Sequence, residues 1–172
     1  NQFEDENFKP KQKYFSEGVV RVLETNRGRS LFGFIDTNGK VVIPPKFEDV
    51  GNFTGCGVTW ARSALDQDSL GIINRSGEWV VKPVLALVMD FDKEAKATMA
   101  TIGDAAYMHS HHWPYYKFNH DGQYAVIKAS GEAIPVSDSI KRLFKFGNGL
   151  AMFRLEGKHG NLGYLDINAQ IV

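Results

Sequence analysis

Short hydrophobic segments, separated by residues that favour turns, recur along the whole chain, and the clearest example lies in residues 33–53. An apolar strand there leads to Asn38-Gly39, and the β-favouring residues 41–43 follow directly. Because glycine adopts positive φ without steric cost, Asn38-Gly39 predicts a hairpin closed by a type I′ turn or by a turn with a glycine bulge. Pro44-Pro45 has no backbone N–H groups, so we expect the regular ladder to end there.

The same strand and turn occur four times, which indicates an internal repeat. Each copy has a large apolar residue, then a glycine or alanine, then two apolar residues and a turn. The small residues are Gly33, Gly71, Ala125 and Gly163. The first two lie 38 residues apart and so do the last two, whereas the middle two lie 54 apart. The sequence therefore predicts a period of 38 residues, with 16 extra residues in the third copy, at about 103–122.

Each copy contains three short segments of β pattern, which predicts an all-β protein built from four three-stranded antiparallel hairpin repeats. We place the repeats at about 15–52, 53–90, 91–145 and 146–172, within a single domain covering 1–172. Residues 1–14 would be the end of a preceding repeat or a closing segment. A small residue in mid-strand predicts close packing at that point, which we expect between repeats. Only residues 139–143 suggest a helical turn.

The two ends of the chain leave two arrangements open. Val172 falls at the repeat position of Val42, and residues 2–5 resemble residues 46–49, which would come next. The chain is then either a piece of a longer open array or a propeller-like ring that its N-terminal segment closes. We favour the solenoid-like array, because such repeats add linearly and need no closure.

The first repeat resembles the bacterial WG repeat, also called the KWG repeat, over residues 15–22 and 32–53. The other copies are more degenerate, and the tryptophan of the family name is absent. Large apolar residues take its place at Phe32, Leu70, Tyr124 and Leu162. The resemblance implies a β-rich bacterial repeat protein with a binding role, and it carries no shared catalytic residues.

Composition limits the classes of partner. The 20 basic and 20 acidic residues cancel, which argues against nucleic acid because phosphate binding needs a basic surplus. The longest apolar run, at 84–89, is too short to span a membrane. The single cysteine, Cys56, excludes an internal disulfide. None of these features indicates a cellular compartment.

Catalytic patterns are lacking in the sequence. No phosphate loop, dinucleotide-binding glycine pattern, zinc-protease motif or nucleophile elbow occurs. Asp36 and Asp166 share one repeat position with Asn74 and Lys128. Because a reactive acid would not be exchanged for lysine, we expect a structural or solvent-exposed role there. Cys56 has no activating base nearby in sequence. We therefore predict a protein that is not an enzyme and needs no cofactor.

The insertion at 103–122 is the most unusual segment, because it holds four of the five histidines and five aromatic residues. As a protruding contact loop it would bind a partner through aromatic and histidine side chains. The candidate residues are Tyr107, His109, His111, His112, Trp113, Tyr115 and Tyr116. Alternatively, His109, His111 and His120 would bind a metal ion. In a third interpretation, the segment is an extra hairpin with buried aromatics.

Three functional hypotheses follow, in decreasing order of support. The first is a non-enzymatic module that binds another protein, and an inhibitor or immunity partner of a secreted toxin is one specific form suggested by the family resemblance. The second is a metal- or small-ligand-binding protein that uses the insertion. The third is an enzyme whose catalytic residues are spread over the loops.

Overall fold

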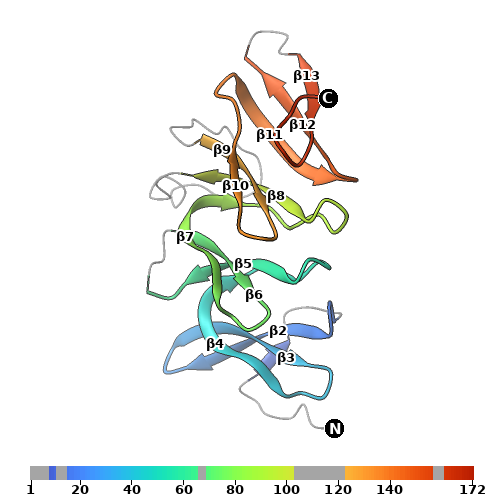
Figure 1. The fold of residues 1–172 in the computed structure, drawn as a ribbon. Coiled ribbons are helices and arrows are strands. Elements are labelled where there is room, and N and C mark those ends of the chain that lie inside the picture. The colour runs from blue at the N-terminus through green and yellow to red at the C-terminus, as the bar shows by residue number, and fades with distance from the viewer. Residues whose placement is uncertain (1–7, 11–14, 66–68, 103–122, 157–160) are drawn as a thin grey trace. The chain divides into compact units, whose positions relative to one another are not determined.

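The computed structural model of the protein describes residues 8–10, 15–65, 69–102, 123–156 and 161–172. These residues form antiparallel strands in open sheets, without a closed barrel and without a helix, which confirms the all-β prediction (Figure 1). No helix among them is therefore long and apolar enough to cross a membrane. The chain divides into two compact units at Pro83/Val84. That all repeats form a single domain stays a prediction.

In the first compact unit each strand pairs with the next one along the chain. Its strands are β1 (Phe8–Pro10), β2 (Val19–Asn26), β3 (Arg29–Asp36), β4 (Val41–Val50), β5 (Val58–Ser63), β6 (Leu70–Asn74) and the first part of β7 (Trp79–Val88). The second compact unit holds the end of β7, β8 (Ala97–Ile102), β9 (Gln123–Lys128) and β10 (Ala133–Pro135). It also holds a separate sheet of β11 (Ile140–Gly147), β12 (Leu150–Leu155) and β13 (Leu162–Leu165).

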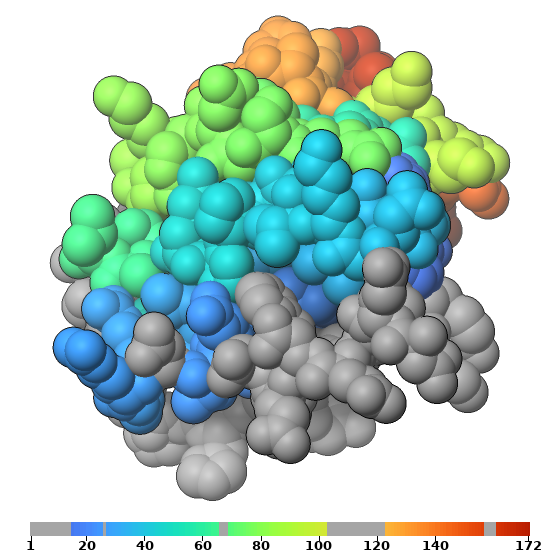
Figure 2. Space-filling model, turned by 90° about the horizontal axis from the view of Figure 1, so that it is seen from below, coloured from blue at the N-terminus to red at the C-terminus, as the bar shows by residue number. Residues whose placement is uncertain are grey.

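The long strand β4 belongs to two hairpins. Its first part pairs with β3, where Ile43 lies opposite Phe34, and its end pairs with β5, where Val50 lies opposite Ala61. The regular ladder with β3 is interrupted at Pro44-Pro45, as expected, but β4 continues through the prolines to Val50. Residues 44–46 have no register partner in either neighbour, so the prolines lie in a bulge of β4 against β3, where no ladder N–H is needed. Figure 2 shows β4, drawn in cyan, lying open on the face seen there.

In the first two repeats the small residue lies where the third strand crosses the second. A Cβ atom on Gly33 would stand 2.7 Å from Pro45 N and even closer to Ile43 O, and one on Gly71 would stand 2.6 Å from Val81 O. The neighbour is thus the third strand of the same repeat. Our expectation of close packing between repeats is wrong, because the third strand bulges over its own hairpin.

In the third repeat, the path of the third strand explains why position 125 can be alanine where the other repeats have glycine. There β10 pairs with β9 in unbroken register, with Pro135 opposite Ala125, so no bulge crosses the small residue. The strand then stops and resumes as β11, which pairs with β12 as β4 pairs with β5. The helical turn suggested for residues 139–143 is therefore wrong. Ile140 and Leu143 are buried as strand residues in the core.

Each compact unit has its own apolar core. In the first, Phe34 packs edge-on against Phe53 with ring centroids 5.0 Å apart, and Phe47 packs against Trp79 at 5.5 Å. In the second, Met99, Val126 and Phe153 lie in one buried cluster. The phenylalanines that open the last three repeats, at 53, 91 and 146, are all buried, which explains why they mark the repeat.

Neighbouring repeats in the first compact unit are also joined by polar contacts to backbone. The Glu17 carboxylate accepts hydrogen bonds from Gly55 N at 2.5 Å and Gly57 N at 3.1 Å. The Arg21 guanidinium donates to Val50 O at 3.0 Å. These contacts fix the start of one repeat against the loop that leads into the next.

All four turns between second and third strands have one geometry. In the first, Gly39 N donates to Asp36 O at 3.0 Å, Asp36 N donates to Lys40 O at 2.9 Å, and Gly39 has φ +81°. This is the predicted turn with a glycine bulge. Matching hydrogen bonds close the turns at 74–78, 128–132 and 166–170. The last of these holds Ala169 at φ +57°.

We predict that Gly33→Ala destabilises the protein by about 2 kcal/mol, because the added methyl group meets backbone that cannot move aside. Gly147→Ala is the control, since a Cβ there meets no atom within 4 Å and its φ is not positive. Denaturant unfolding of the full chain measures both. Equal stability of the two variants would show that the crossing strand yields to the methyl group.

Ala169→Gly should stabilise the protein by about 0.5 to 1 kcal/mol, because alanine is strained at positive φ and glycine is not. The reverse change in the first turn, Gly39→Ala, should destabilise it. Thermal unfolding monitored by circular dichroism tests both. A less stable Ala169→Gly protein would contradict the assignment of this turn.

Candidate functional site

The residues that the sequence singled out as a site lie outside the described residues. This holds for Tyr107, His109, His111, His112, Trp113, Tyr115, Tyr116 and His120. The partner-binding and metal-binding interpretations of the insertion both stay predictions. Within the part of the chain that the structure describes, no group of three or more His, Cys, Asp or Glu side chains is placed to hold a metal ion.

Every repeat contains two kinds of connection between its described strands. The turn between second and third strands is the same each time, and we call these the constant turns. The connection between first and second strands differs each time. These variable connections are Arg27-Gly28, 64–69, 103–122 and 156–161. Loops that differ while the scaffold repeats are where repeat proteins carry their binding residues.

Two variable connections meet in the first compact unit. Arg29 Nη2 donates a hydrogen bond of 2.6 Å to Ala64 O, which joins the start of β3 to the segment that follows β5. The next residue, Leu65, has 97% of its surface exposed. We call Arg27-Gly28, Arg29 and residues 64–65 the variable edge of this unit. The constant turn at residues 74–78 makes different contacts, with Glu17 through Arg75 and with Lys46 through Gly77 O.

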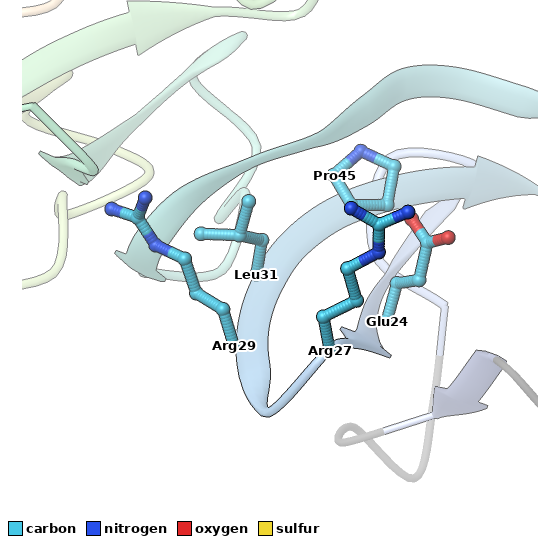
Figure 3. A pocket seen from close by; sticks show the side chains of 5 residues that line it. All are labelled: Glu24, Arg27, Arg29, Leu31 and Pro45. Carbon is cyan, nitrogen blue, oxygen red and sulfur yellow. The ribbon is translucent and has the colours of Figure 1, made fainter.

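An open cavity lies beside the variable edge. It is lined by Glu24, Arg27, Arg29, Leu31 and Pro45, and in Figure 3 the two arginines lie on opposite sides of Leu31. The lining carries two cationic side chains and one anionic side chain over an aliphatic floor.

The local sequence explains this cavity. Arg29, Leu31 and Gly33 alternate along β3, so they share one face, and Glu24 lies opposite Leu31 in β2. Because Gly33 has no side chain, β4 approaches closely and Pro45 forms one wall. Arg27 has φ +49° in a two-residue turn with Gly28, a position that usually favours asparagine, aspartate or glycine. The arginine therefore occupies a backbone conformation that costs free energy.

Sequence reasoning missed this cavity because it followed the longest insertion. The available signal was an arginine at each side of Gly28, in the shortest of the four variable connections. Neither Pro45 nor Glu24 carries a sequence signal, since their place in the cavity depends on the bulge of β4 over Gly33.

The repeated acidic position is structural, as predicted. Asp36 Oδ1 accepts hydrogen bonds from Asn38 N at 2.8 Å and Lys40 N at 2.9 Å. The amide oxygen of Asn74 accepts the equivalent pair at 2.9 and 3.0 Å, so this role needs an oxygen acceptor and not an acid. In the third repeat Lys128 occupies the position and instead forms an ion pair with Glu132 at 3.1 Å.

Taken together, the described residues form an antiparallel β-hairpin repeat protein with constant turns and variable connections. The family model described as WG containing repeat matches residues 32–63 and 71–98. These two segments match the WG repeat, so the predicted resemblance is confirmed. Each match begins at the second strand of one repeat and ends in or just after the first strand of the next. Neither the curated proteins nor the solved structures contain a match to the chain.

Asp166 provides a test of the constant turn by pH. The N–H groups of Gln170 and Asn168 hold the pKa of this carboxyl below the ordinary aspartate value. Its contribution to the free energy of unfolding is therefore present above the ordinary pKa and lost as the pH falls through the lowered one. Asp166→Asn should reduce the loss of stability in acid, measured by unfolding at a series of pH values. Asp138→Asn, away from the constant turns, is the control, and equal acid sensitivity of both variants would contradict the turn assignment.

Proposed function

We propose that this protein is a non-enzymatic module that binds another protein through its variable connections. The observation that carries the proposal is the hydrogen bond from Arg29 to Ala64 O, because it joins the residue that follows one variable connection to the start of another, beside an open cavity. Arginine is enriched among residues that dominate binding energy at protein interfaces. The scaffold beneath is a paired sheet, so a partner would meet a largely preformed surface.

The exposed Leu65 supports the same proposal. Its side chain is 97% exposed, and burying a leucine contributes about 2 kcal/mol. In the third repeat the variable connection is the insertion at 103–122, which leaves β8 after Ile102 and returns at Gln123. These two residues are register partners, so the strands remain paired up to the insertion. Its tyrosines, tryptophan and histidines would supply further contact residues in the second compact unit.

The WG repeats support a binding role for the array, and inhibition of a secreted toxin is one specific form of it. That form is supported by the family resemblance and not by a particular side chain. Absence of enzymatic activity is also part of the proposal, and it is supported by the structural role of Asp36 and Asp166 in their turns.

The test is affinity capture from a lysate of the source organism, followed by binding of the purified pair. The baits are the intact chain, a chain with residues 104–121 replaced by a Gly/Ser linker, and the double variant Arg29→Ala/Leu65→Asp. The matched control is Lys40→Ala/Val41→Asp, which changes one cation and one exposed apolar residue at a constant turn. Circular dichroism first shows that every bait is folded.

We expect a partner that binds the intact chain and the control with equal affinity. The same partner should bind the double variant or the linker variant at least about tenfold more weakly, which corresponds to a loss of about 1.4 kcal/mol or more in binding free energy. Loss of binding only in the control would move the site to the constant turns. Failure to capture any specific partner, or failure of the purified pair to bind directly, would count against a protein-binding module.

A further inference from the structure

We infer that the cavity between Arg27 and Arg29 receives a carboxylate from an acidic, partly apolar segment of the partner protein. This inference rests on the proposed function and specifies the chemistry of the partner. It uses only residues of the first compact unit that the structure describes.

The cavity lining carries more cationic than anionic side chains. Arg29 uses one nitrogen on Ala64 O, and this hydrogen bond fixes the direction of its side chain. Arg27 lines the same cavity on the other side of Leu31 (Figure 3). A guanidinium group presents its N–H groups in a planar fork that matches the two oxygens of a carboxylate. Two such groups beside one cavity therefore favour an anionic ligand with fork geometry.

The floor of the cavity restricts the ligand further. Leu31, between the two arginines, and Pro45, beside Arg27, offer aliphatic surface (Figure 3), and Leu65 lies exposed next to the residue that Arg29 contacts. A free inorganic anion would leave this apolar surface in water. A peptide that carries leucine-like side chains next to its carboxylates would cover it and gain from its burial.

The charge of Glu24 leads to a second expectation, which concerns the affinity of the cavity for an acidic segment. Its carboxylate lines the same cavity and repels an incoming anion, while the aliphatic part of its side chain adds to the wall. Removing this charge should therefore strengthen the binding of an acidic segment. A gain of affinity is informative because a variant that merely failed to fold would lose affinity.

The test measures fluorescence anisotropy of a labelled peptide probe against the full chain at low ionic strength. The probe is a capped peptide of the sequence Gly-Leu-Glu-Glu-Leu-Gly, and its isosteric counterpart has glutamine in place of both glutamates. Variants are Arg27→Gln/Arg29→Gln and Glu24→Gln. The control is Lys40→Gln/Arg75→Gln, which removes two cations at constant turns.

We expect saturable binding of the acidic probe, at least about tenfold tighter than the glutamine probe, and weakened by added salt. The Arg27/Arg29 variant should lose about tenfold in affinity, the control should keep it, and Glu24→Gln should gain about threefold. Equal binding of the two probes, unchanged binding by the Arg27/Arg29 variant, or no saturable binding by the intact chain would overturn the inference. The proposed function would still be tested separately, by whether capture of a partner depends on the variable connections.

Discussion

The close approach of the third strand to a residue without a side chain underlies the first repeat of the array. At Gly33, the backbone of Ile43 and Pro45 occupies the space that a Cβ atom would take. This contact lets β4 cross its own hairpin, change partner and pair with β5. Ile43 and Phe47, on either side of the crossing, are buried in the core, so a local steric condition determines where the apolar residues lie.

The hairpin that contains this crossing has two kinds of connection, the constant turn and the variable connection, and they differ in what their side chains do. Three of the four constant turns use a side-chain oxygen at their first position to hold their own backbone, which leaves that oxygen engaged within the hairpin. The variable connections carry no such requirement, because the strands on either side are already paired. The variable edge is therefore free to vary in sequence, and it also exposes two cations, Arg27 and Arg29, on either side of a glycine.

Much of this architecture could be predicted from the sequence, because it follows from local rules. The glycine bulge at Gly39 and the period set by the small residues depend on residues close together in the chain. The path of β4 through Pro44-Pro45 could not be predicted, since proline in isolation argues against a strand. The bulge of β4 against β3 removes that conflict, because residues 44–46 need no ladder N–H there. Ile140–Gly147 formed a strand for a related reason: pairing with β12 and burial outweighed a weak local preference. The cavity depends on both effects, so its residues carried almost no signal.

The strand shared between two hairpins has a consequence for how such genes change length. Because β4 pairs with β3 of its own repeat and with β5 of the next, the paired hairpins do not begin and end where the sequence repeats do. The family matches also run from one second strand into the following repeat. Recombination that adds or removes one whole period, at any point within it, gives every internal third strand a neighbour on each side. Arrays of this kind can therefore be lengthened or shortened by crossing-over without a privileged breakpoint, while each new copy brings a connection free to diverge.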